Sequence, residues 1–179
     1  MSPAILEHDW FPRPIPENVY LGERSWLYSA FAFLHYQSRR PCGVRIGHDT
    51  GLYAGTFFEL GPDAEVEIGN YCTIVGAIIA TDRRISVGDY ALIAHEVVIA
   101  DSGIVQPERP VSSSPKDPEL SIVIGENVWI GAGAMLLAGA KIGRGAIVGA
   151  ATLVDFEVPE YAIVAGNPAK ICGWANRKK

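Results

Sequence analysis

The sequence of 179 residues lacks any uninterrupted apolar run of about 18 residues, the length that a membrane-spanning helix needs. Its first residues carry neither the charged start nor the apolar stretch of a secretory signal. Basic residues number 15 against 20 acidic ones, and the net charge of −5 argues against nucleic acid as the main partner. These absences predict a cytoplasmic protein without a membrane span.

Cysteine and histidine are both scarce. The three cysteines, Cys42, Cys72 and Cys172, are odd in number and far apart, which favours reduced thiols over a disulfide framework. The four histidines include no closely spaced pair. A zinc site built from three histidines is therefore a poor fit, and no metal site is predicted.

The chain has instead a strict period of six residues between positions 124 and 154. Six aliphatic residues follow one another at this interval, and Gly or Ala often takes the next place: Ile124, Ile130, Leu136, Ile142, Val148 and Val154. A helix would place apolar residues three and four apart, and a half-buried strand every second residue. The period predicts very short strands joined by tight turns, which is the hexapeptide pattern of a parallel β-helix.

The same period begins well before that tract. Earlier sets of three comprise Ile46, Leu52 and Phe58, then Ile68, Ile74 and Ala80, then Val87, Ile93 and Ile99. Each set opens with an aliphatic residue followed by Gly, and three hexads make one triangular coil. The sequence thus predicts an all-β solenoid of about five coils over residues 44–171. All insertions between sets fall at one corner, and the longest predicts a protruding loop over residues 103–121.

The two ends of the chain differ from the repeats. Residues 1–43 begin with an arm rich in aromatics and proline. An amphipathic helix is predicted from about Glu23 to Gln37, with Leu27, Phe31 and Leu34 on one face. Residues 172–179 form a short basic tail.

Two segments carry a family resemblance: IGENVWIGAGA at residues 124–134 and VPEYAIVAGNPAK at residues 158–170. With the repeats, they make residues 44–171 resemble the hexapeptide-repeat acyltransferases, the family of maltose, galactoside and xenobiotic O-acetyltransferases. The resemblance alone implies a left-handed coil. It also implies a homotrimer that binds acetyl-CoA, or another acyl-CoA, between subunits. The implied reaction is acyl transfer to a hydroxyl or amine of a sugar, amino sugar or nucleotide-sugar, a small polar acceptor.

The resemblance places the cofactor along one corner and the tail that follows it, at Gly131, Ala132, Gly149, Ala150, Pro168 and Lys170. The phase of the hexads supports this independently. Ala132, Ala150 and Pro168 are eighteen residues apart, so we expect them in one column at about 4.8 Å per coil. Small residues there would admit a slender pantetheine arm, and Lys170 suits a phosphate. The alternative is that Ala and Gly are simply what such a corner tolerates.

The catalytic base departs from the family pattern. Family members carry a histidine at the start of the long loop, where this chain reads IADSG at residues 99–103. His95 follows Ile93 as Ala132 follows Ile130, so it is predicted to enter the cofactor column and act as the base. The alternative is an edge histidine that lines a subunit interface. His48 is expected to take the matching place in the first coil, as a surface residue.

Three further residues complete the predicted site. Asp101 and Ser102, at the root of the loop, are expected to bind the acceptor. Trp129 is expected to line the part of the site that holds the acyl group of the cofactor. Because the loop histidine is missing, a catalytically inactive trimeric scaffold is the alternative function. A γ-class carbonic anhydrase shares the expected fold, but it needs three zinc-binding histidines in one groove.

Overall fold

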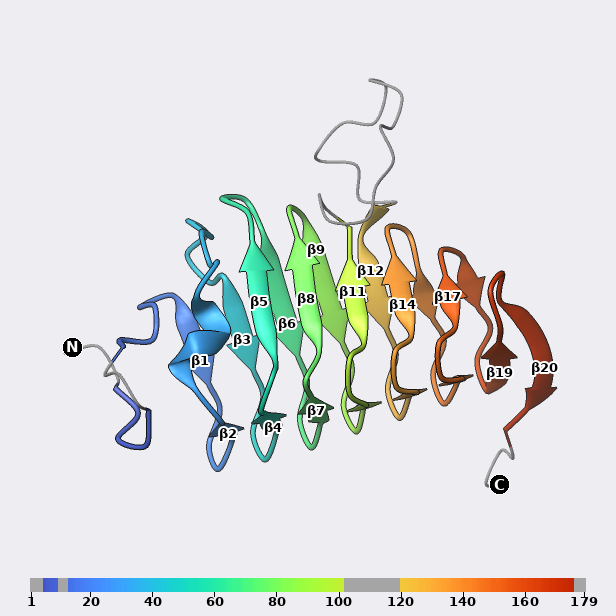
Figure 1. Ribbon diagram of the computed structural model, residues 1–179, viewed down its shortest axis with the longest axis horizontal. Coiled ribbons are helices and arrows are strands. Elements are labelled where there is room, and N and C mark those ends of the chain that lie inside the picture. Colours follow the sequence, from blue (N-terminus) through green and yellow to red (C-terminus); the bar gives the residue numbers. More distant parts are fainter. Residues whose placement is uncertain (1–4, 10–12, 102–119, 176–179) are drawn as a thin grey trace, which may run out of the picture.

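The computed structural model describes residues 5–9, 13–101 and 120–175. The chain winds through them as a three-sided solenoid, and the coils stack along one long axis (Figure 1). Each inner coil contributes one short strand to each face, and strands of successive coils pair in parallel. The predicted all-β solenoid is thereby confirmed.

Three sheets form the faces. The first face consists of β1 (Val19–Leu21), β3 (Val44–Ile46), β6 (Glu65–Ile68), β9 (Arg84–Val87), β12 (Ile122–Ile124), β15 (Lys141–Ile142) and β18 (Glu157–Val158). The second face consists of β2 (Trp26–Leu27), β4 (Gly51–Tyr53), β7 (Thr73–Val75), β10 (Leu92–Ile93), β13 (Trp129–Ile130), β16 (Ile147–Val148), β19 (Ala162–Ala165) and the antiparallel β20 (Lys170–Trp174). The third face consists of β5 (Phe57–Leu60), β8 (Ile78–Thr81), β11 (Val98–Ala100), β14 (Met135–Leu137) and β17 (Leu153–Val154). We call the corner between the first and second faces the first edge, the next the second edge, and the last the third edge.

The aliphatic residues of the period fill the inside of the solenoid. On the second face, Ile130 pairs with Ile93 of the preceding coil and with Val148 of the following one. All three side chains are at most 1% exposed. Because every coil repeats this arrangement, the buried side chains form one continuous core, which is the main stabilising contribution in a repeat fold.

Glycines at the first edge explain the aliphatic–Gly pair that opens each set. A Cβ on Gly88 would lie 2.7 Å from the backbone nitrogen of Glu126, and one on Gly125 would lie 2.8 Å from that of Arg144. Both distances are too short for a carbon atom. Glycine is therefore required for the backbones of successive coils to approach closely.

The predicted helix over residues 23–37 is wrong. Within that range lie strand β2 and a single 3-10 turn, η1 (Ala30–Phe33). Strands β1 and β2 pair with β3 and β4, so the solenoid has about six turns and begins at Val19 rather than at residue 44. The helical spacing misled because Leu27 and Phe33 turn inward from a strand and a 3-10 turn, whereas Leu34 is exposed.

The spacing between inward-facing residues is shorter than expected at two places. In the coil of β6 to β8, Ile79 and not Ala80 pairs with Phe58 and Ile99, because only five residues separate it from Ile74. In the last coil, Val148 pairs with Val164, sixteen residues on. A prediction that counts eighteen residues per coil therefore assigns the wrong residues to the strand pairs at these two places.

Most of the predicted loop over residues 103–121 falls on 102–119 and so lies outside the described residues. In the part of the chain that the structure describes, no helix is long and apolar enough to cross a membrane.

Candidate functional site

The second edge repeats one backbone conformation from coil to coil. A residue with positive φ occurs there in successive coils, with φ of 81° at Gly55, 61° at Gly76, 59° at Glu96, 67° at Gly133 and 53° at Ala151. This left-handed conformation lets the chain turn sharply between two flat faces. The second edge therefore repeats nearly the same backbone turn in each coil, and the residue before each positive-φ residue determines which side chain the edge exposes. We call this repeated backbone of the second edge the rail.

His95, Ala132 and Ala150 immediately precede three of these residues and form one exposed row. The backbone N–H of Gly133 donates to the carbonyl oxygen of His95 at 2.9 Å, and that of Ala151 donates to the carbonyl oxygen of Ala132 at 2.9 Å. The row places these residues in consecutive coils, about 4.8 Å apart. The structure thus brings His95 together with two of the predicted cofactor residues.

The glycines beside this row differ in what surrounds them. A Cβ on Gly131 would lie 2.6 Å from the backbone nitrogen of Ala150, so Gly131 serves close packing between coils. A Cβ on Gly133 would meet no heavy atom within 4 Å, so the space over the edge is open there. Gly149 follows Gly131 in the next coil and is only partly exposed. A slender ligand can therefore lie along the edge against the backbone.

Trp129 stands on the second face beside the row. Its strand position is equivalent to those of Leu92 and Ile147 in the neighbouring coils, and its side chain is 54% exposed. An exposed indole of this size needs a ligand or a second protein surface to be covered.

Pro168 does not continue the column, which corrects the prediction from spacing. The last coil has sixteen residues, so Gly166 rather than Pro168 takes the next place. Pro168 lies in the exposed turn between β19 and β20. Lys170 is exposed at the start of β20, opposite Ala165, and so stands beside the C-terminal end of the row.

The structure separates Asp101 from His95. Asp101 follows β11 at the third edge, so the whole width of the third face separates it from His95 at the second edge. Its side chain is buried and accepts hydrogen bonds from the Thr81 hydroxyl at 2.6 Å and from the Asp82 backbone N–H at 3.0 Å. Burial raises the pKa of this carboxyl. Asp101 therefore holds the third edge together rather than facing an open site, contrary to the expected acceptor contact.

Ser102, the other expected acceptor residue, lies outside the described residues.

His48 lies on the first edge, not in the place matching His95. Its Nδ1 is 2.7 Å from the Asp49 carboxylate, and its ring meets the Tyr71 ring edge-on at 5.0 Å between centroids. The Arg24 guanidinium binds the same carboxylate with two hydrogen bonds of 2.7 and 2.6 Å, which, with His48, lowers the pKa of Asp49 to about 2. The prediction for His48 was wrong because the two histidines belong to different hexads. His48 follows Ile46, which opens the first hexad of its set, whereas His95 follows Ile93, which opens the second hexad.

No group of three or more His, Cys, Asp or Glu side chains is placed to hold a metal ion within residues 5–9, 13–101 and 120–175. His48 and His95 stand on different edges. A zinc centre of the carbonic anhydrase type finds no support in these described residues.

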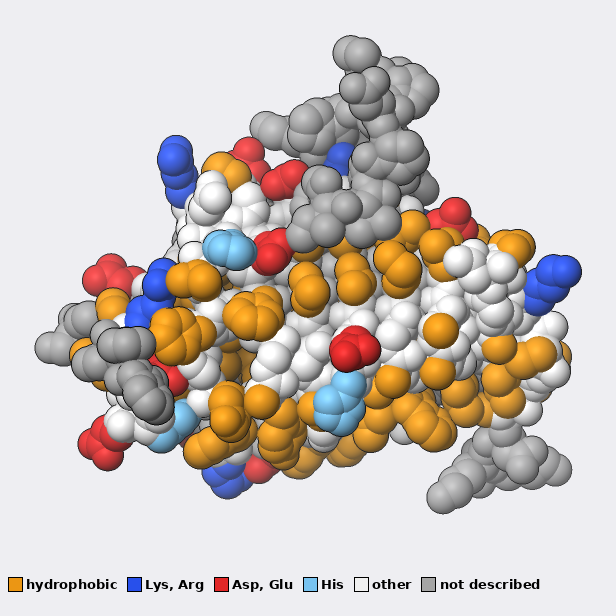
Figure 2. Space-filling view, in the orientation of Figure 1, with side chains coloured by type: hydrophobic (Ala, Val, Ile, Leu, Met, Phe, Trp, Pro, Cys, Tyr) orange, Lys and Arg blue, Asp and Glu red, His pale blue; other side chains and the backbone are white. Residues whose placement is uncertain are grey.

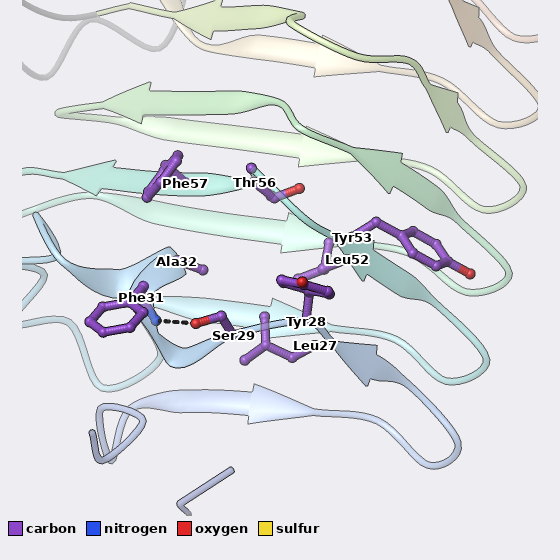
Figure 3. Close-up of a pocket in the computed structure, with 10 residues that line it drawn as sticks. Leu27, Tyr28, Ser29, Phe31, Ala32, Leu52, Tyr53, Thr56 and Phe57 are labelled. Atoms are coloured by element: carbon purple, nitrogen blue, oxygen red, sulfur yellow. Dashed lines mark hydrogen bonds between the residues drawn. The ribbon is translucent and has the colours of Figure 1, made fainter. Parts of the chain in front are cut away.

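Sequence reasoning missed a pocket of about 210 Å³ at the N-terminal end of the second edge (Figure 3). Residues from β2, η1, β4 and β5 line it, among them Leu27, Phe31, Ala32, Tyr53 and Thr56. The sequence could not show this pocket, because the wrong helix prediction replaced the wall that β2 and η1 form.

Comparisons with known proteins agree with this architecture. Residues 121–155 match the family model described as bacterial transferase hexapeptide (six repeats). WbbJ of Escherichia coli K12, a candidate O-acetyl transferase of lipopolysaccharide biosynthesis, is 37% identical over 101 residues, which cover 52% of this chain and 52% of that protein. Galactoside O-acetyltransferase of the same organism is 28% identical over 131 residues, which cover 70% of this chain and 61% of that protein.

A solved structure shares the fold. A mutant of AntD, an N-acyltransferase from Bacillus cereus in complex with dTDP and coenzyme A, superposes with a TM-score of 0.64 at 22% identity, covering 89% of this chain and 86% of that chain. This chain spans between 52% and 61% of the lengths of the two curated relatives above. The resemblance to hexapeptide-repeat acyltransferases is thus confirmed.

Proposed function

We propose that this chain is a CoA-dependent acyltransferase that transfers an acetyl group from acetyl-CoA to a hydroxyl or amine of a sugar, amino sugar or nucleotide-sugar. The observation that carries the proposal is the row on the second edge, where His95 stands at the end of an open rail of small residues. The two Escherichia coli relatives bear acetyltransferase names, and AntD was solved with coenzyme A. We place the protein in the cytoplasm, where its three free thiols would stay reduced.

The residues of the rail fit an acyl-CoA. Ala132 and Ala150 present short exposed side chains, and the space over Gly133 is open, so the pantetheine arm would lie along them. Lys170 offers an exposed ammonium at the C-terminal end of the row for a phosphate, and Pro168 would border the nucleotide end. The cofactor supplies an activated acyl group as a thioester. The thioester would then lie near His95 and Trp129.

His95 would act as the general base. As the acceptor oxygen or nitrogen forms its bond to the acyl carbon, its proton passes to the imidazole, and the carbon–sulfur bond breaks. The imidazolium then returns the proton to the departing thiolate, so that His95 ends the cycle neutral.

We further propose that the chain works as a homotrimer, because the faces that flank the second edge are apolar. On the second face Tyr53 and Leu92 are each 44% exposed, and Trp174 at its end is 61% exposed. Figure 2 shows apolar side chains in rows across the viewed side of the solenoid. The outer side of the first face instead carries charged residues such as Glu67 and Arg84. Apolar faces of this extent are typical of subunit interfaces.

Blocking the rail is expected to abolish CoA binding. In Ala150→Leu, an isobutyl group would occupy the path of the pantetheine arm, and we expect the affinity for CoA to fall by at least about 10-fold. Ala54→Leu is the matched control, because Ala54 is another exposed alanine on the same edge, N-terminal to His95. Isothermal titration calorimetry of both variants measures the effect. Equal CoA affinity in wild type and Ala150→Leu would move the cofactor away from this edge.

A trimeric scaffold without activity is the second candidate, because residues 99–103 lack the histidine that the family resemblance implies at the start of the loop. Acceptor-dependent release of thiol from acetyl-CoA excludes the scaffold. A protein that binds no CoA and releases no thiol with any acceptor would make it the better account.

A further inference from the structure

His95 and Glu96 interrupt an edge that is otherwise built from small uncharged residues. The second edge comprises the segments between strands of the second and third faces, which are residues 54–56, 76–77, 94–97, 131–134 and 149–152. Apart from His95 and Glu96, these segments hold Gly, Ala, Thr and Val alone. Within these five described segments, Glu96 is therefore the only acidic residue, and it is the sequence neighbour of the proposed base.

Glu96 occupies a backbone position that suits glycine better. It is the positive-φ residue of its coil, with φ of 59°, where three of the other four coils have Gly and one has Ala. A long side chain in this left-handed conformation is disfavoured by contacts with its own backbone. Residues held in this way are found most often where a binding or catalytic site needs their side chain.

The carboxylate of Glu96 is open to a ligand. Only the backbone of this residue is held, because its N–H donates to the carbonyl oxygen of Gly76 at 3.0 Å. The side chain is exposed, and its carboxylate has no hydrogen bond or ion pair with any residue that the structure describes. At the equivalent position of the next coil, a Cβ on Gly133 would meet no heavy atom within 4 Å. A side chain at this position thus projects away from the solenoid.

The coil of His95 and Glu96 lies between two different parts of the edge. On its C-terminal side is the row of Ala132 and Ala150, along which we place the pantetheine arm. On its N-terminal side is the coil that turns in five residues instead of six, where Gly76 and Ala77 form the whole corner. An acceptor that lies over this small corner would meet the imidazole and the carboxylate together.

From these observations we infer that Glu96 selects the acceptor by charge, because its carboxylate binds the protonated amino group of an amino sugar while a hydroxyl of the same molecule faces His95. This assignment rests on the proposed acyltransferase function and narrows its acceptor class. A protonated amine has no free electron pair, so the group that attacks the thioester is the hydroxyl. The same carboxylate disfavours acceptors with a phosphate close to the reacting group.

Binding of three sugars, measured by ligand-observed NMR titration without CoA, tests the assignment. Methyl glucosaminide carries a protonated amine, methyl glucoside has a hydroxyl in the same place, and glucose 1-phosphate carries an anion. We expect the wild type to bind methyl glucosaminide most tightly, and added salt to weaken this binding. Glu96→Gln, which keeps the shape of the side chain, should lower that affinity about 3- to 10-fold and leave the affinity for methyl glucoside unchanged. Glu96→Lys, which reverses the charge, should make glucose 1-phosphate the tightest ligand of the three.

Two further variants separate a binding role from a structural one. Glu126→Gln removes an exposed carboxylate from the first edge, 3.9 Å from the Arg144 guanidinium, and should leave all three affinities unchanged. Glu96→Gly should abolish the preference for methyl glucosaminide without lowering the Tm, because glycine adopts positive φ readily. A lower Tm in this variant, with the preference retained, would show that Glu96 only stabilises the turn and would overturn the assignment.

The outcomes also separate this assignment from the proposed function. Equal affinities for methyl glucosaminide in wild type and Glu96→Gln, or no binding of this sugar, would overturn the role of Glu96. Binding that depends on the charge at position 96, without release of thiol from acetyl-CoA, would support that role and count against the proposed reaction. Acetylation of sugars at rates unaffected by the Glu96 substitutions would do the reverse.

Discussion

Replacing His95 with alanine is expected to lower kcat/KM for acyl transfer by about 100-fold or more, with little change in the affinity for CoA. The imidazole is the only side chain of the exposed row that has a basic nitrogen, because the equivalent places in the next two coils hold Ala132 and Ala150. Loss of the base removes an interaction made in the transition state, whereas the rail of small residues stays intact. Steady-state kinetics of thiol release measure the first quantity, and calorimetry the second.

His48→Ala is the matched control for this experiment. His48 is a partly exposed histidine on the first edge that contacts Asp49 and Tyr71. Its replacement with alanine should leave kcat/KM unchanged. Wild-type turnover in His95→Ala would show that His95 is not the catalytic base and is only an exposed residue of the edge.

Replacing Phe58 with alanine is expected to destabilise the fold by about 3–5 kcal/mol. Phe58 is 0% exposed, pairs with Ile79 in the next coil and stacks on Phe33 of η1. Its removal leaves a cavity at the junction between the first coil and the rest of the solenoid. The free energy of unfolding in urea, from circular dichroism, measures the effect.

The neighbouring Phe57 provides the comparison for Phe58. It belongs to the same strand and is 38% exposed, so Phe57→Ala should cost less than about 1.5 kcal/mol. Equal losses in the two variants would contradict the assignment of inward and outward positions on β5.

The six-residue period predicted the solenoid because each aliphatic residue must point inward for neighbouring coils to share a core. That requirement is local and repeats, so Ile124, Ile130 and Leu136 were placed correctly from spacing. The constraint is weaker at corners. One residue fewer between Ile74 and Ile79 changes no apolar pattern, because Ala80 is also buried, and only strand pairing reveals the shift.

The N-terminal coil could not be predicted for a related reason. Its strands hold two and three residues, too few for any period to show, and η1 replaces a strand on the third face. The row of His95, Ala132 and Ala150 was predictable, since eighteen-residue coils connect its last members. The pocket around Thr56 was not, because one of its walls comes from η1 and the other from β4 and β5, which only the fold brings together.

The most direct test of the central claim is acceptor-dependent release of thiol from acetyl-CoA by the intact chain, with the acetylated acceptor identified by mass spectrometry. Sugars, amino sugars and nucleotide-sugars form the panel. The row on the second edge predicts thiol release that requires an acceptor and matches the acetylated product one to one. Release that ignores every acceptor, or no release together with no binding of CoA, would contradict an acyltransferase site at this edge.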